Sequence, residues 1–248
     1  MDKWLKEIKD SLRGYQVIFR FLYMLTTPVF GKSPKSILEH IPVGGKIINL
    51  GSGVLSIDPR VIDVDFYPYP NVKVVADAAN LPFENNSIDG IICQSLLEHV
   101  ADADAVIKEI KRVLKSGGWL YVSVPFILGF HSAPMDYRRW TAMGLEKSFA
   151  EFEEKFSGPA CGPTLAFTRI AGEWLSLVLS FGISGLYQLW NLFFMLIFLP
   201  VNLLDYVFIR YKFASNPLRQ RTLTGTHQQH FRTQKARMKK SMKQKKLT

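Results

Sequence analysis

Cysteine is nearly absent from this sequence, with Cys93 and Cys161 the only two in 248 residues. Two cysteines are too few for a disulfide framework or for a metal site built from thiolates, and they suit a reducing compartment. An apolar signal-peptide core is also missing, because charged residues from Lys3 to Arg13 interrupt the N-terminus. We therefore expect a cytoplasmic protein with no metal site.

Acidic residues are absent from residues 210–248, a segment that holds twelve Lys or Arg. The net charge of +10 therefore divides into +12 for this segment and −2 for residues 1–209. A near-neutral body does not fit a basic nucleic-acid-binding domain, which carries its charge on a folded face. From Arg219 onward no apolar periodicity is visible, so residues 215–248 are predicted to be a disordered basic tail.

Charge is absent from the 31 residues 174–204, more than the roughly 20 that span a bilayer. Gly182, Gly185 and Pro200 interrupt this stretch. A single crossing would also separate the basic tail from the rest of the chain. We expect residues 171–214 to form apolar helices that lie in the membrane interface or make a shallow hairpin, with the tail attracted to anionic lipids. The alternative is a helical cap buried on the folded domain, with the tail in solvent.

The remainder of the chain has the composition of a folded protein, since 48% of all residues are apolar. Apolar residues recur at spacings of three and four in residues 1–32, which predicts an N-terminal amphipathic helix, either packed on the domain or acting as a lid or membrane-surface helix. Residues 33–170 alternate short apolar runs with helical patterns, including a helix at 105–114, and are predicted to form an α/β domain with a mostly parallel sheet. The expected strands are 46–50, 61–65, 72–76, 90–93 and 119–124.

Small and acidic residues follow the first three of these strands. Gly51 and Gly53 come directly after the first strand, where the missing side chains let a ligand approach the backbone. Asp65 ends the second strand and Asp77 the third. Because ligands bind beyond the carboxyl ends of parallel strands, these groups predict a nucleoside site in which one carboxylate accepts ribose hydroxyls and the other an adenine amine.

In this arrangement the sequence resembles the class I S-adenosylmethionine-dependent methyltransferases, specifically the type 11 methyltransferase domain. The similar segments occur in the family's order, at residues 48–53, 64–65, 76–83, 87–91 with 97–100, and 112–118. The resemblance implies a Rossmann-like fold and S-adenosylmethionine as cofactor. It implies that the cofactor is held by Asn49, Gly51, Gly53, Asp65, Asp77, Ala78 and Leu97, the last two near the adenine.

Two features depart from the family pattern. Asn49 stands where the family usually has an acid, so its contact to the amino group of the cofactor would be weaker. Only residues 54–60 separate the glycine turn from the second strand, which is too short for a crossover helix. We predict a shortened first crossover with cofactor binding retained; the alternative is a degraded cofactor site.

A polar and aromatic cluster follows the fifth strand and is similar to a segment of a type 11 subgroup often associated with cell-surface polysaccharide or lipid biosynthesis. His131 is the candidate base for a hydroxyl or carbon acceptor. The predicted acceptor-binding residues are Asp136, Tyr137, Arg138 and Arg139. The structural alternative makes His131 a loop residue and Asp136–Arg139 an ion pair.

Three functions remain as hypotheses. The first is a methyltransferase at the cytosolic membrane face, peripheral or monotopic, that acts on a lipid-linked or surface-glycan precursor. The second is an RNA or protein methyltransferase whose tail binds polyanions; methylation of base amines is disfavoured, because residues 93–96 lack the Asn/Asp-Pro-Pro-aromatic turn. The third is a catalytically silent, membrane-associated module that keeps the fold.

Overall fold

The computed structural model describes residues 31–129, 135–208 and 219–224. The predicted N-terminal helix therefore lies almost wholly outside the described residues. The same holds for His131 and for most of the basic tail.

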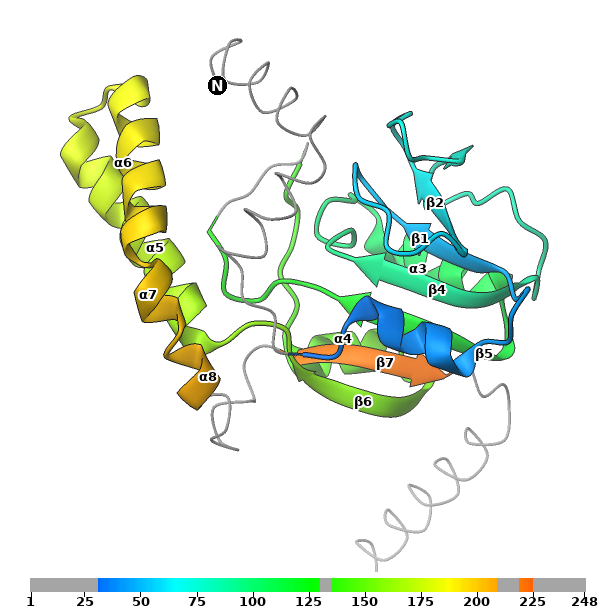
Figure 1. Cartoon of the computed structure of the whole chain (residues 1–248). Helices are drawn as coiled ribbons and strands as arrows, with labels where there is room; N and C mark the ends of the chain where they lie inside the picture. The colour runs from blue at the N-terminus through cyan, green and yellow to red at the C-terminus, as the bar shows by residue number, and fades with distance from the viewer. Residues whose placement is uncertain (1–30, 130–134, 209–218, 225–248) are drawn as a thin grey trace, which may run out of the picture.

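The centre of the molecule is a seven-stranded sheet with the order β3-β2-β1-β4-β5-β7-β6 (Figure 1). Five strands run in parallel, and they are β1 (Ile47–Leu50), β2 (Val61–Asp65), β3 (Val74–Val75), β4 (Ile88–Gln94) and β5 (Leu114–Ser123). The last two neighbours, β7 (Arg219–Thr224) and β6 (Glu153–Pro159), pair antiparallel. The predicted mostly parallel α/β sheet is confirmed.

The two faces of the sheet pack against different partners, as the alternation of side chains along a strand requires. On one face, residues such as Ile48 and Ile91 join a core with helix α3 (Ala103–Val113) and helix α4 (Ala142–Ser148). On the other face, their neighbours Ile47 and Ile92 pack on the short 3-10 helix η1 (Pro34–His40). Asp102 caps α3 by accepting a hydrogen bond from the Ala105 N–H, 2.9 Å away.

The end of α3 differs from the sequence prediction. The sequence predicts a helix at 105–114 and a strand that starts only at residue 119, but β5 begins at Leu114, directly after the helix. Gly117 has a φ of +79° within this strand, so this glycine accommodates an irregular stretch of strand.

The first crossover is short, as predicted. Residues 51–60 connect β1 to its parallel neighbour β2 without a helix. A parallel connection normally uses a dozen or more residues, so this loop must be held by contacts of its own. These contacts involve Asn49, one of the predicted cofactor-binding residues.

Strand β7 corrects the prediction for the C-terminal part of the chain. Residues 219–224 belong to the segment 215–248, which the sequence predicts to be a disordered tail. They instead lie between β5 and β6 and pair with both. The segment Arg-Gln-Arg-Thr-Leu-Thr has no apolar alternation, so its strand conformation depends on partners that are remote in the sequence.

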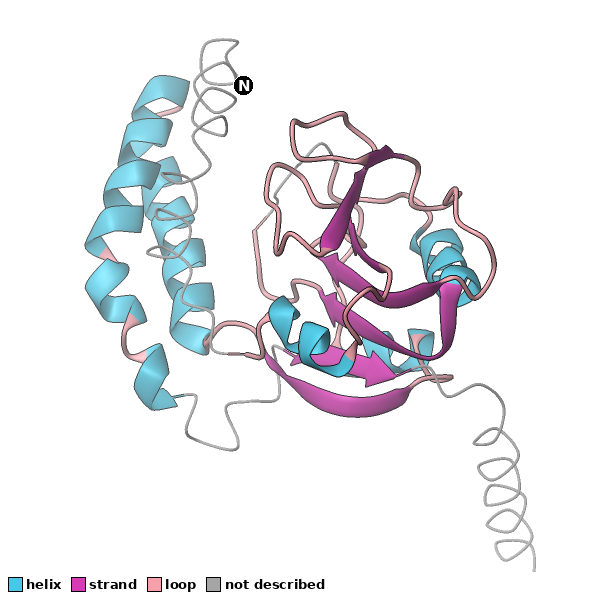
Figure 2. Ribbon diagram, turned by 45° about the vertical axis from the view of Figure 1, so that its right-hand side comes forward, coloured by secondary structure: helices cyan, strands magenta, loops and turns pink. Residues whose placement is uncertain are grey.

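The apolar helices are consequently an insertion between two neighbouring strands, β6 and β7. The inserted helices are α5 (Pro163–Ser180), α6 (Ser184–Ile197), α7 (Leu199–Asn202) and α8 (Asp205–Phe208). Helices α5 and α6 lie side by side as a hairpin that stands beside the sheet in both views (Figures 1 and 2). The expected boundary at residue 171 falls inside α5, because the helix begins at Pro163.

Candidate active site

The glycine turn after β1 adopts a conformation suited to a backbone ligand site. Gly51 and Gly53 have φ values of +71° and +56°, which L side chains rarely adopt. At Gly51 a Cβ atom would lie 2.8 Å from Leu96 Cδ1, so close packing also requires glycine there. At Gly53 a Cβ atom would meet no atom within 4 Å, so open space adjoins this backbone.

Asp65, at the end of β2, is joined directly to this turn. Its Oδ2 accepts a hydrogen bond of 2.8 Å from the Gly53 N–H, and its Oδ1 accepts one of 2.9 Å from the Tyr67 N–H. An ionised carboxylate has about four acceptor positions, so two hydrogen bonds leave capacity for ligand hydroxyls. The structure thus places the predicted glycine and acid together at the carboxyl edge of the sheet.

The side-chain amide of Asn49 is hydrogen-bonded to the neighbouring strand β2. Its Nδ2 donates to Asp63 Oδ1 at 2.9 Å and to the Leu55 carbonyl at 3.4 Å. Asp63 Oδ2 also accepts hydrogen bonds from the Ser56 hydroxyl and from Asn71 Nδ2. Asn49 and Asp63 are both buried, and the network connects β1 and β2 to the loop between them, which explains how so short a crossover is held.

Sequence reasoning missed Asp63. The only available signal was an acid at an inward position of an otherwise apolar strand. Asp63 is also the partner of residue 49 in the β1–β2 register. An acid at residue 49, as is usual in the family, would therefore face a second acid, which explains why this chain has asparagine there.

The adenine-side segment, residues 76–83, follows the third strand, β3. Asp77 Oδ1 accepts a hydrogen bond of 2.9 Å from the Ala79 N–H, while Ala78 and Leu97 are buried in the core next to the turn. Helix α3 fixes the residues that follow. The Leu81 N–H donates to Glu109 Oε2 at 2.9 Å, and Arg112 donates to the carbonyls of Leu81 and Phe83 at 3.0 and 2.8 Å. Arg112 also donates to the Glu109 carboxyl group and thereby lowers its pKa, so these two side chains form an ion pair beside the adenine-side segment.

Glu98 is a second residue that the sequence did not single out. It is 1% exposed, and neither carboxyl oxygen has a hydrogen-bond partner within the described part of the chain. His99 Nε2 lies 3.8 Å from Oε1, and His99 Nδ1 lies 2.5 Å from the Met135 carbonyl. Burial raises the pKa of Glu98, against the opposing influences of its own backbone hydrogen bond, of His99 and of Arg139.

This raised pKa makes a prediction for stability. A carboxyl whose pKa is higher in the folded than in the unfolded state holds its proton more tightly when folded, so stability falls as pH rises through the interval between the two values. Glu98→Gln removes the titration. Its melting temperature should exceed that of the wild type at about pH 8, and the two should converge near pH 4, below the unfolded pKa. The exposed Glu84→Gln serves as control; an equal response of both variants in thermal unfolding would contradict the assignment.

Residues 135–139 meet the turn after β4. The Tyr137 N–H donates to the Glu98 carbonyl at 2.8 Å, which adds to the His99–Met135 contact. The predicted acceptor residues therefore lie against the turn that contains the predicted cofactor residue Leu97.

Arg138 and Arg139 have different environments. Arg139 forms a two-bonded ion pair with Asp136, and its remaining N–H groups donate to the carbonyls of Leu128, Gly129 and Arg138. Asp136 and Arg139 thus make the ion pair that the structural alternative expected. The Arg138 guanidinium instead lies over the Trp140 ring, 5.5 Å from its centroid.

Comparison with known proteins agrees with this geometry. Residues 53–122 match the family model described as a methyltransferase domain of type 11. Over this segment the chain is similar to the class I S-adenosylmethionine-dependent methyltransferases, in agreement with the resemblance of its motifs.

Two curated relatives and one solved structure illustrate the similarity. A demethylmenaquinone methyltransferase of Geobacillus sp. is 35% identical over 35% of this chain and 39% of its own length. A tRNA (carboxymethyluridine(34)-5-O)-methyltransferase of Arabidopsis thaliana is 30% identical over 38% and 28%. A possible histamine N-methyltransferase of Thermotoga maritima gives a TM-score of 0.46 at 18% identity, over 62% of this chain and 86% of that one. The chain thus spans well under half the length of these two curated relatives.

Proposed function

We propose that this protein transfers the methyl group of S-adenosylmethionine to an acceptor. The observation that carries the proposal is the joining of Gly53 to Asp65 at the carboxyl edge of the sheet, beside open space. Asp77 follows the neighbouring strand β3, two residues beyond its end at Val75, which fits a ligand that extends from ribose to adenine.

Each residue has a role that follows from its chemistry. S-adenosylmethionine supplies a methyl group on a sulfonium, which an acceptor takes by in-line displacement. Asp65 accepts hydrogen bonds from the ribose hydroxyls, and Asp77 accepts one from the exocyclic amine. Ala78 forms the apolar side of the adenine site, and Leu97, which is fully buried, belongs to the core that supports it. Gly51 and Gly53 permit close backbone approach. The protein's contribution to rate is then alignment of the acceptor and exclusion of water.

For the acceptor, we propose a lipid-linked or surface-glycan precursor at the cytosolic membrane face. Arg138 is better suited than Arg139 to hold an anionic group, because the N–H groups of Arg139 are already engaged. The uncharged stretch of residues 174–204, which lies within the helices inserted between β6 and β7, supports a membrane location. His131 is our proposed base for an acceptor hydroxyl, and Asp136 and Tyr137 would shape the acceptor side.

An RNA acceptor is the second candidate. The segment 210–248 has twelve Lys or Arg residues and no Asp or Glu, and one relative is named as a tRNA methyltransferase. This candidate predicts nucleic-acid affinity that falls steeply with salt.

The acceptor class can be tested with methyl-labelled S-adenosylmethionine and the full-length protein. Label should appear in the organic phase when a membrane lipid extract is supplied, and should be lost with Arg138→Ala. Label that appears only in added RNA or protein would contradict the lipid-linked acceptor and favour the second candidate.

A further inference from the structure

The hairpin of α5 and α6 has its polar groups inside and its large apolar groups outside. The buried residues of α5 along its contact with α6 are small or polar, with Thr168, Gly172, Ser176 and Ser180 at intervals of four. Gly172 lies against the Cβ atom of Phe194 on α6 and against the ring of Phe198, the residue that follows α6. In water-soluble helical hairpins the large apolar residues occupy the interior, whereas membrane helices bring small residues to their contacts.

The hydroxyl groups within this contact are satisfied inside the hairpin. Ser176 Oγ donates to the Gly172 carbonyl at 2.6 Å, and Ser180 Oγ donates to the Leu177 carbonyl at 2.7 Å. Neither serine exposes its side chain to solvent. From Trp174 to the turn, α5 therefore presents no charged group and no exposed serine hydroxyl, as an apolar surrounding phase requires. Ser184, which begins α6, is the exposed serine at the turn.

The outer surface is formed by large apolar side chains. Those on the two helices and their turn include Phe167, Leu177, Phe181, Ile183, Leu189 and Leu192, all exposed. Phe181, at the turn, is 82% exposed, so the apolar character extends to the end of the hairpin. A surface of this kind marks an interaction site.

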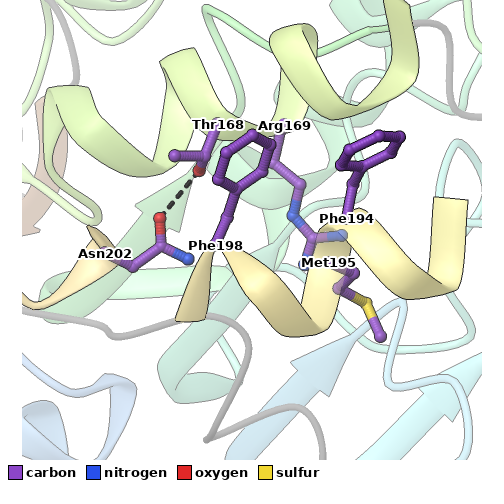
Figure 3. Close-up of a pocket in the computed structure, with 6 residues that line it drawn as sticks. All are labelled: Thr168, Arg169, Phe194, Met195, Phe198 and Asn202. Atoms are coloured by element: carbon purple, nitrogen blue, oxygen red, sulfur yellow. Dashed lines mark hydrogen bonds between the residues drawn. The ribbon is translucent and has the colours of Figure 1, made fainter. Parts of the chain in front are cut away.

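Polarity changes along the hairpin. Its base has charged and polar groups: Arg169 extends from α5 toward α6 between Phe194 and Phe198, and Thr168 Oγ1 donates to Asn202 Oδ1 at 2.7 Å (Figure 3). Glu173 is the last charged residue before the turn. Asp205, fully buried, accepts hydrogen bonds from the N–H groups of Thr164 and Leu165 at 2.7 and 2.9 Å.

The dimensions fit one leaflet of a bilayer. At 1.5 Å per residue, the eight steps from Glu173 to Phe181 span about 12 Å, whereas half of the hydrocarbon core is about 15 Å. Trp174, next to Glu173 on α5, is 61% exposed, and tryptophan is enriched at membrane–water interfaces.

The topology requires the chain to return to the side from which it entered. Pro159 of β6 and Arg219 of β7 are partners in the sheet, so both ends of the insertion are tied to the same domain. No single described helix is long and apolar enough to cross a membrane, although α6 with the bent continuation Leu199–Phe208 passes by length and composition. A crossing by that pair alone would separate the two ends.

From these observations we infer that the hairpin α5–α6 inserts turn-first into one leaflet of a lipid bilayer, with Phe181 deepest and Glu173 at the headgroups. The basic segment 210–248 adds attraction to anionic lipids. This inference deepens the proposed membrane location, and cofactor binding does not depend on it.

The test is flotation of the full-length protein with neutral phosphatidylcholine vesicles at high salt, which suppresses the contribution of the tail. The wild type should float. Phe181→Asp should lower the partition coefficient by about 30- to 100-fold, because an acid at membrane depth is strongly disfavoured. Val43→Asp is the matched control, since Val43 is 91% exposed outside the hairpin, and it should float as the wild type does.

Several results would overturn the inference. These are a wild type that stays unbound, a Phe181→Asp variant that floats equally well, or a wild-type dimer that Phe181→Asp dissociates without any vesicle binding. The dimer result would show that a second copy of the chain covers the hairpin. Calorimetric titration of the same preparations with S-adenosylmethionine shows whether the proposed function fails as well. Cofactor binding without vesicle binding would overturn only the membrane inference.

Discussion

Replacing Asn49 by aspartate should lower the free energy of unfolding by about 3 kcal/mol at neutral pH. The change restores the residue type usual in the family, yet here it removes the amide that donates to Asp63 Oδ1 and puts a second carboxylate 2.9 Å away in a buried site. Two carboxylates at this distance cannot both ionise without cost. The loss should therefore shrink at acid pH, where the pair shares a proton.

The double variant Asn49→Asp, Asp63→Asn supplies the control, because it exchanges the two groups and restores one donor and one carboxylate. Chemical denaturation should show that it regains most of the lost stability. If Asn49→Asp is as stable as the wild type, the network around Asp63 does not hold the short crossover.

Replacing Asp205 by alanine should cost about 3 kcal/mol and detach the base of the hairpin. The carboxylate is fully buried and accepts two backbone hydrogen bonds at the N-terminus of α5, which has no side-chain cap of its own. Gly162 leaves room for it, since a Cβ atom there would overlap the carboxyl group. Without Asp205, two buried N–H groups lose their acceptor and the favourable charge at the helix N-terminus disappears.

Limited proteolysis should then cut the inserted helices of Asp205→Ala faster than those of the wild type, while β1 to β5 stay protected. Asp104→Ala, at an exposed position of α3, should behave as the wild type. Unchanged proteolysis of Asp205→Ala would show that the hairpin is held by its apolar contacts alone.

The parallel half of the sheet could be predicted from sequence because its strands are short apolar runs that bury both faces. β2 has the predicted bounds, and β1 and β4 differ from theirs by a few residues. β3 and β7 are different. Only two residues of β3 pair as a strand, and the sequence of β7 has no apolar pattern. Their conformation is decided by neighbouring strands, which a local pattern does not report.

The site shows the same division. Gly53 and Asp65 were predictable because they follow consecutive strands, and topology then brings them together. The partners of Asn49 and the burial of Glu98 depend on contacts across the fold, so no spacing revealed them. For the hairpin, the absence of charge was visible in the sequence, whereas its inward-facing serines and its place between β6 and β7 required the structure.

The central claim is that this chain binds S-adenosylmethionine through the acid at the end of β2. Calorimetric titration of the full-length protein tests it most directly, with Asp65→Ala as the variant and Asp104→Ala as the control. We expect the wild type and the control to bind one equivalent, and Asp65→Ala to bind about 100-fold more weakly, since it loses the acceptor of the ribose hydroxyls and the partner of the Gly53 N–H. A wild type that does not bind would contradict the account and leave a catalytically silent module with a methyltransferase fold.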